Sequence, residues 1–150
     1  MLRSGRILLE WVCLALMVAL VGDVFLGVWS RYIMQATFRW YDEVARLCFI
    51  WIIFLGAAVA VARRLHFRMH LVVDRFGPRL RLAVERLVTL SVIAFGGVLV
   101  AGGIRMAPIA HRQVTDALEI SQLWFFAALP VGGALMILFA LPQLRGAREP

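Results

Sequence analysis

Residues that a water-soluble protein needs are scarce in this sequence. Only 17% of its 150 residues are charged, whereas 63% are hydrophobic. That balance excludes a soluble domain of ordinary type, because such domains carry far more polar surface. A chain of this length can form a few membrane helices, but it leaves no room for an extramembrane catalytic domain beside them.

Lysine is absent, and all sixteen basic residues are arginine. They produce a net charge of +7, but they gather at the ends of apolar runs. Arginines placed in this way determine membrane topology and contact anionic headgroups, so we predict membrane lipids rather than nucleic acid as their partners. The two cysteines, Cys13 and Cys48, fall near opposite membrane faces in antiparallel helices, which is too far apart for a disulfide.

Four apolar runs are long enough to cross a bilayer, and only a helix satisfies every backbone polar group at that depth. They cover residues 7–34, 43–63, 83–108 and 121–141. The first run is longer than a signal-peptide core and lacks an A-x-A cleavage site, so we expect it to be retained. Residues 65–82 carry apolar side chains at helical spacing and contain Gly77-Pro78 as a stop, which predicts a short amphipathic helix in the membrane interface. The predicted fold is an all-α membrane protein with one transmembrane domain over residues 1–150.

The arginines are distributed unequally between the two sides of this arrangement. Four lie on one side: Arg31, Arg39, Arg105 and Arg112. Eleven lie on the other: Arg3, Arg6, Arg63, Arg64, Arg68, Arg75, Arg79, Arg81, Arg86, Arg145 and Arg148. Because arginine favours the cytoplasmic side, we predict that both termini and the loop over residues 63–86 are cytoplasmic.

Asp23 places a carboxylate inside the first run. Counted from an outer boundary near Tyr32, it lies roughly 13 Å deep, close to the midplane. Arg46, counted from Asp42, lies roughly 6 Å deep from the same face, and its long side chain can reach towards Asp23. This placement predicts a structural ion pair between the first two spans or a contact with a partner subunit. A proton or ion site is less favoured, because one lone carboxylate makes a poor pathway.

The second run begins with a polar and aromatic group of residues. Trp40 suits the aromatic belt at the membrane surface. Asp42 and Glu43 favour helix capping and an interaction with the helix dipole. A contact between Glu43, Arg46 and a partner subunit is the alternative, because the two side chains lie three residues apart on one helical face.

His66, His70 and Asp74 recur on one stripe of the expected interfacial helix. Histidines at this spacing bind metals in other proteins, but the neighbouring arginines disfavour a cation here. A haem held by two histidines fails on topology, because His111 lies at the opposite end of the membrane from His66 and His70. No nucleophile has a partner at a shared depth, so we expect no enzyme activity, no metal and no cofactor.

Small residues mark where these helices can approach one another closely. We expect helix packing, rather than a substrate path, at Gly56, Ala60, Gly96, Gly97, Gly132 and Gly133.

A set of residues occurs in a fixed order along the chain, within the four apolar runs and in the segments between them. It consists of Arg31-Tyr32, Trp40-x-x-Glu43 with Arg46, Trp51, Phe54-Leu55-Gly56-Ala57-Ala58, Arg63-Arg64, His70-Leu71-Val72-Val73-Asp74, Thr115-x-Ala117-Leu118-x-Ile120, Trp124 and Leu129-Pro130-Val131-Gly132. With this set on a four-span topology, the chain resembles the small membrane subunit (Q, or DctQ-type) of tripartite ATP-independent periplasmic (TRAP) transporters. The resemblance covers residues 24–139, nearly the whole length.

The resemblance implies a role in the bacterial inner membrane beside a large membrane subunit and a periplasmic substrate-binding protein. The binding protein would capture an organic acid, such as a C4-dicarboxylate or a sugar acid. The large subunit would carry it inward by a sodium-coupled elevator movement. The small subunit would be a fixed, non-catalytic scaffold. Its candidate subunit-contact or structural polar residues are Asp23, Arg31, Trp40, Asp42, Glu43, Arg46, His70 and Asp74.

Two alternatives from other classes stay open. One is a self-sufficient, homo-oligomeric small transporter that uses Asp23 as its coupling carboxylate. The other is a membrane anchor of a respiratory enzyme, which the placement of the histidines disfavours.

Overall fold

A computed structural model describes residues 2–36, 38–63 and 78–144 of the chain. The described residues form helices α1 (Leu2–Tyr32), α2 (Trp40–Ala62), α4 (Pro78–Arg112), α5 (Leu123–Phe126) and α6 (Ala128–Leu144). Four stretches are long and apolar enough to span a membrane: Gly5–Tyr32, Trp40–Ala62, Ala83–Arg112, and Leu123–Leu144, which joins α5 to α6. The prediction of an all-helical protein with four spans is therefore confirmed.

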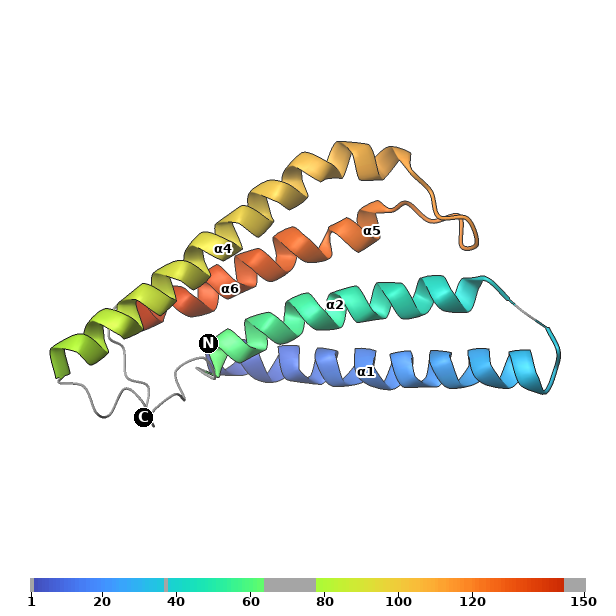
Figure 1. The fold of residues 1–150 in the computed structure, drawn as a ribbon, viewed down its shortest axis with the longest axis horizontal. Helices are drawn as coiled ribbons and strands as arrows, with labels where there is room; N and C mark the ends of the chain where they lie inside the picture. Colours follow the sequence, from blue (N-terminus) through green and yellow to red (C-terminus); the bar gives the residue numbers. More distant parts are fainter. Residues whose placement is uncertain (1, 37, 64–77, 145–150) are drawn as a thin grey trace.

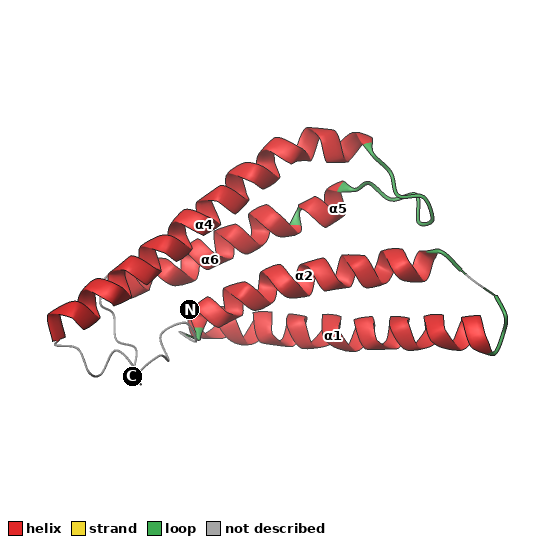
Figure 2. Ribbon diagram, in the orientation of Figure 1, coloured by secondary structure: helices red, strands yellow, loops and turns green. Residues whose placement is uncertain are grey.

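Figure 1 shows the helices arranged as two antiparallel hairpins, α1 with α2 and α4 with α6. The second and fourth spans lie side by side and join the hairpins. The start of α1 and the ends of α2 and α6 gather at one end of the bundle, which we call the terminal end. Residues 33–36 and 38–39, between α1 and α2, and the loop over residues 113–122 lie at the other end, the loop end (Figure 2).

The third helix extends beyond its predicted range at both ends. It begins at Pro78, not near residue 83, because proline suits the first turn of a helix, where its missing N–H needs no partner. It also continues through Pro108 to Arg112. The predicted interfacial helix falls largely in residues 64–77, which lie outside the described residues.

The fourth span is divided into α5 and α6 at Ala127. Pro130 stands in the first turn of α6. The N–H groups of a first turn have no carbonyl acceptor within their own helix, so the N–H that proline lacks is not missed there. The chain nevertheless keeps its direction, since the Val131 N–H donates to the Ala127 carbonyl at 3.2 Å. Ala127 itself keeps helical backbone angles, with a φ of −62° and a ψ of −25°, so the division does not end the span.

The core joins α2 to α6 near the terminal end. Its buried members are Ala58, Val61, Met136, Phe139 and Ala140. The Gln143 side chain extends this contact by donating to the Val61 carbonyl at 2.9 Å. By contrast, many large apolar side chains on α1 are exposed, as expected for a surface facing lipid or another protein.

Candidate functional site

The candidate site begins at the first turn of α2, at the loop end of the bundle. The residue preceding the helix is Arg39, and no side chain caps the first turn by a hydrogen bond. Trp40 stacks on Tyr41, with ring centroids 3.8 Å apart. Asp42 is exposed, whereas Glu43 is half-buried and turned towards the rest of the bundle.

Glu43 binds the loop between α4 and α5. Its Oε1 accepts a hydrogen bond from the Ala117 N–H and its Oε2 accepts one from the Leu118 N–H, both at 2.9 Å. Bonds from neutral donors to a carboxylate are stronger than bonds between two neutral groups. The helix-capping interpretation of Glu43 is thus replaced by a contact between segments more than seventy residues apart in the sequence.

The loop over residues 113–122 is shaped to present these two N–H groups. Val114 and Ser121 form an isolated antiparallel bridge, and the Thr115 N–H donates to the Ile120 carbonyl at 2.9 Å. At its tip Glu119 has a φ of 54°, a left-handed conformation that reverses the chain. We call Glu43 together with this loop the outer latch.

Arg46 lies one turn further along α2. The carbon of its guanidinium group lies 5.8 Å from the centre of the Phe125 ring, within the range of a cation–π contact. It lines an open groove of about 230 Å³ between α2 and α5, which we call the Arg46 groove. The remaining lining residues are Ile50, Phe54, Thr115, Gln122, Phe125, Phe126 and Leu129.

A second bond also ties α2 to α5. The Trp51 indole N–H donates to the Trp124 carbonyl at 3.1 Å. Together with the outer latch, it fixes the position of α5 relative to α2. The Arg46 groove therefore has a defined wall on each side.

The structure does not bring Asp23 and Arg46 together. Asp23 is buried, with 8% of its surface exposed, and its Oδ2 has no hydrogen-bond partner. It lines a separate pocket between α1 and α2, which also includes Arg31 and Asp42. The predicted ion pair of Asp23 with Arg46 is absent from the described residues, and Arg46 contacts Phe125 instead.

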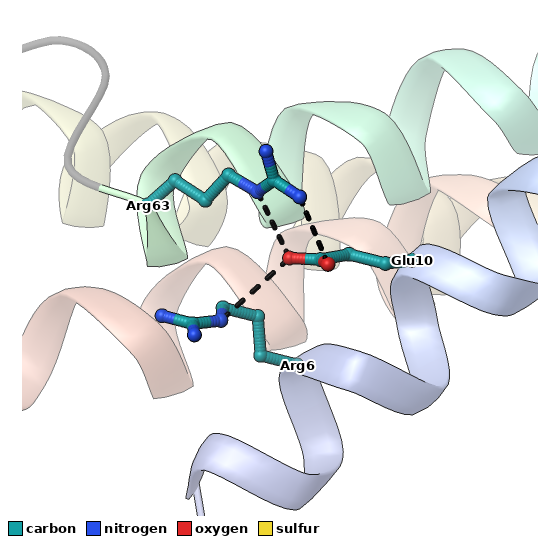
Figure 3. Close-up of polar contacts among 3 residues, drawn as sticks. All are labelled: Arg6, Glu10 and Arg63. Atoms are coloured by element: carbon teal, nitrogen blue, oxygen red, sulfur yellow. Dashed lines mark hydrogen bonds and ion pairs between the residues drawn. The ribbon is translucent and has the colours of Figure 1, made fainter.

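A polar cluster at the terminal end was missed by the sequence analysis. Figure 3 shows Arg63, just after α2, holding Glu10 of α1 through two contacts of 2.9 Å, while Arg6 approaches the same carboxylate at 3.6 Å. The signal was present in the sequence. Glu10 is the one acidic residue in the first half of the first run, and Arg63 ends the antiparallel neighbour.

The six small residues expected at packing sites fall into two groups. A Cβ atom added at Gly96, Gly132 or Gly133 would lie within 3.0 Å of a neighbouring helix, so these helices approach closely there. Nothing lies within 4 Å of a Cβ added at Gly56 or Gly97, and Ala60 is half-buried. Gly103 lies against Pro130 in the same way as the first group.

Two candidate residues, His70 and Asp74, lie outside the described residues. Across the residues that the structure describes, no group of three His, Cys, Asp or Glu side chains could hold a metal ion. The loop end brings together three polar features: a half-buried carboxylate bound by a loop, an exposed guanidinium at a groove, and a pocket with a buried carboxylate.

Comparison with known proteins gives this geometry a context. The model of the family described as "tripartite ATP-independent periplasmic transporters, DctQ component" matches residues 20–149. The small permease protein SiaQ of a sialic acid TRAP transporter from Vibrio cholerae is 26% identical over 135 residues, which are 90% of this chain and 78% of that protein.

Two further relatives are much longer than this chain. The sialic acid TRAP transporter permease protein SiaT of Haemophilus influenzae is 29% identical over 128 residues, which are 85% of this chain and 21% of that protein. The isethionate TRAP transporter permease protein DctMQ of Oleidesulfovibrio alaskensis is 26% identical over 109 residues, which are 71% of this chain and 17% of that protein. This chain thus spans about a fifth of each of these two longer relatives.

Proposed function

This chain belongs to the DctQ component family of the tripartite ATP-independent periplasmic transporters, and from that premise we propose that it is a fixed scaffold for a large permease subunit. The family consists of transporter permease subunits rather than enzymes, and four apolar spans suit a multi-pass protein of the inner membrane. In the proposed complex, a periplasmic binding protein delivers an organic acid, and the large subunit carries it inward with sodium. The small subunit stays in place and enlarges the anchorage of the complex in the bilayer.

The longer relatives support the proposed partner. In SiaT and DctMQ, a segment similar to this chain forms about a fifth of a permease protein. Two segments on one polypeptide have a high effective concentration for each other, so a contact between them needs little affinity of its own. A separate small subunit lacks this covalent link. It must instead supply a contact surface with enough affinity to hold its partner in the membrane.

The outer latch is the observation that carries the scaffold proposal. Glu43 satisfies two backbone N–H groups of the loop and so fixes that loop on α2 before any partner binds. A preorganised surface loses less conformational entropy on association than a mobile one. This geometry favours a rigid contact surface over a moving element.

We place the contact with the large subunit at the Arg46 groove. Among the described residues Arg46 forms no ion pair, and it is exposed beside the apolar side chains of Ile50, Phe54 and Phe126. A cation near the membrane surface gains most from an anionic partner in surroundings where water screens poorly. A carboxylate of the large subunit, seated over the groove, would supply that partner.

A pull-down of the large subunit tests this contact. We expect Arg46→Ala to lower the yield of complex, normalised to membrane expression, more than Arg112→Ala does. Arg112 is the matched control because it is an exposed arginine in the last turn of α4, at the same end of the bundle. Equal yields for the two variants would contradict the Arg46 contact.

Reconstitution separates the scaffold from the self-sufficient transporter. Liposomes containing this chain alone should show no sodium-driven uptake of an organic acid, whereas liposomes with the large subunit and the binding protein should. Uptake by the chain alone that Asp23→Asn abolishes would establish the transporter alternative.

We also propose that the terminal end faces the cytoplasm, following the arginine distribution. A cysteine introduced at Thr115 should then react with an impermeant reagent added to the periplasmic side. Labelling only after the membrane is opened would reverse the orientation.

A further inference from the structure

Asp23 stands apart from the other buried polar side chains in the described part of the chain. Three polar residues are buried: Asp23, Ser30 and Thr89. The Ser30 hydroxyl donates to the Ala36 carbonyl at 2.6 Å, and the Thr89 hydroxyl donates to the Glu85 carbonyl at 2.9 Å. Of these three, only Asp23 keeps a buried atom, Oδ2, that has no hydrogen-bond partner. The other such atom among the described residues, Arg6 Nε, lies 3.6 Å from the Glu10 carboxylate. An unsatisfied carboxylate oxygen in such a place is costly, and it requires a physical explanation.

The unpartnered oxygen belongs to a residue that lines a pocket between α1 and the start of α2. The pocket has a volume of about 180 Å³, well above the roughly 15 Å³ that one water molecule requires. It has charges of both signs, with Asp23 and Asp42 as its carboxylates and Arg31 as its cation. Its other lining residues are Val24, Gly27, Val28, Tyr32, Phe38, Tyr41 and Ala45.

The depths of these charged groups differ. Asp23 is buried, whereas Arg31 and Asp42 are exposed near the loop end. A ligand entering from the loop end would meet the two exposed charges first and the buried carboxylate last. Tyr32, Phe38 and Tyr41 line the pocket along the same route.

We propose that this pocket binds one positively charged group at Asp23, either a monovalent metal cation or the primary ammonium of a phospholipid headgroup. Such a group supplies the countercharge that the isolated carboxylate lacks, and it supplies hydrogen bonds or metal coordination to Oδ2. Transition metals are disfavoured, because the described residues offer no group of three suitable ligands here.

Arg31 distinguishes the two sources of positive charge. A phospholipid carries a phosphate next to its ammonium group, and an arginine binds phosphate through parallel N–H donors. Arg31 at the exposed part of the pocket is placed to hold that phosphate while the ammonium group reaches Asp23. A free metal cation gains nothing from Arg31. Loss of this arginine should therefore weaken the lipid and leave the metal cation unaffected or more tightly bound.

The test uses the full chain in nanodiscs of two compositions. In phosphatidylcholine nanodiscs, NaCl is titrated against choline chloride at constant ionic strength, and the thermal unfolding midpoint is measured. In nanodiscs containing phosphatidylethanolamine, native mass spectrometry counts the lipids retained after release. We expect saturable binding of either sodium or phosphatidylethanolamine. Asp23→Asn should weaken the affinity for that ligand roughly tenfold or more, as expected for loss of a charged partner.

Asp116→Asn is the matched control, since Asp116 is an exposed carboxylate at the same end of the bundle but outside the pocket. It should bind as the unmodified chain does. Arg31→Gln then assigns the source, because it should release phosphatidylethanolamine but not sodium.

The unmodified chain keeps the proposal testable if Asp23→Asn fails to fold. It must either respond to sodium over choline or retain phosphatidylethanolamine over phosphatidylcholine. A chain that does neither would overturn the proposal. Binding that survives Asp23→Asn in a folded variant would overturn it as well.

Discussion

The first and fourth spans are both apolar enough to cross a membrane, yet they are packed in different ways. Within the most apolar part of α1, 6% of the residues are buried, against 39% in the span formed by α5 and α6. Large side chains such as Leu8, Trp11 and Val18 cover the outside of α1. Small residues, among them Ala128 and Gly133, face the interior from α6.

The difference shows that hydropathy alone does not indicate which span will be central. In a membrane, apolar side chains gain little by leaving lipid for protein, so close packing decides the arrangement. The α4–α6 hairpin achieves this closeness by pairing Gly96 with Gly133. The α1–α2 hairpin has no such glycine pair among its described residues. It has polar contacts at the terminal end and a pocket near the loop end.

Of the substitutions considered, we expect the largest loss of stability where α4 and α6 approach each other most closely. A Cβ atom added at Gly133 would lie 2.7 Å from the Gly96 carbonyl oxygen and 2.9 Å from the Leu99 Cβ. Gly133→Leu should therefore force α4 and α6 apart and destabilise the fold by about 3 kcal/mol or more, the upper end for overpacked cores. The midpoint of unfolding in detergent, with the monodisperse fraction after chromatography, measures this.

Gly97→Leu provides the matched control for that variant. Gly97 is adjacent to Gly96 in the sequence, but it is exposed, and nothing lies within 4 Å of an added Cβ. This substitution should leave the unfolding midpoint unchanged or raised, because leucine is a better helix former than glycine. If Gly133→Leu and Gly97→Leu lowered the unfolding midpoint equally, the glycine pair would not be what holds α4 against α6.

Sequence reasoning predicted the spans well, because length and apolarity determine them physically. The ends of the helices were less predictable. The helix beginning at Pro78 starts five residues before the predicted third span, since polar residues can extend a helix beyond the bilayer. The break at Ala127 depends on local backbone geometry around Pro130, which hydropathy does not report.

The contacts within the candidate site were harder to predict than its residues. Glu43 and the segment containing Ala117 and Leu118 were both singled out, but nothing in the sequence indicated that they meet. A carboxylate bound to backbone N–H groups leaves no pattern of charge pairing, because the loop supplies the donors whatever its side chains are. Depth alone allows Arg46 to pair with Asp23 or with a partner subunit, whereas its lateral position on α2 places it against Phe125.

The outer latch should give the second largest effect, and it joins the two hairpins rather than stabilising one. Glu43→Gln replaces the anionic acceptor and leaves only one oxygen for two N–H donors. Hydrogen exchange at the Ala117 and Leu118 amides should accelerate by roughly tenfold, as expected when bonds to a charged acceptor are lost.

Asp42→Asn tests whether position, rather than charge alone, causes that effect. Asp42 precedes Glu43 in the same helical turn, but it is exposed and forms no ion pair among the described residues. Its replacement should leave amide exchange in the loop unchanged. A general interaction with the helix dipole would instead make the two variants behave alike.

The smallest effect is expected at the terminal end, where the α1–α2 hairpin is joined by Glu10 and Arg63 (Figure 3). The geometry is bidentate, but the side chains of Arg63 and Glu10 are 52% and 27% exposed. Water and salt screen such a pair, and ordering two long side chains costs entropy. Arg6, at 3.6 Å, can replace part of the lost contact.

Glu10→Gln and Arg63→Gln should therefore each lower the unfolding midpoint by only about 1–2 °C, and the double variant should lower it by little more. The interaction energy between Glu10 and Arg63 should decrease as the salt concentration is raised, since the pair is partly exposed. The comparison is a double-mutant cycle at low and high ionic strength, in the same detergent as the Gly133→Leu variant. If either single variant lowered the unfolding midpoint as much as Gly133→Leu does, polar contacts rather than close packing would hold the spans together.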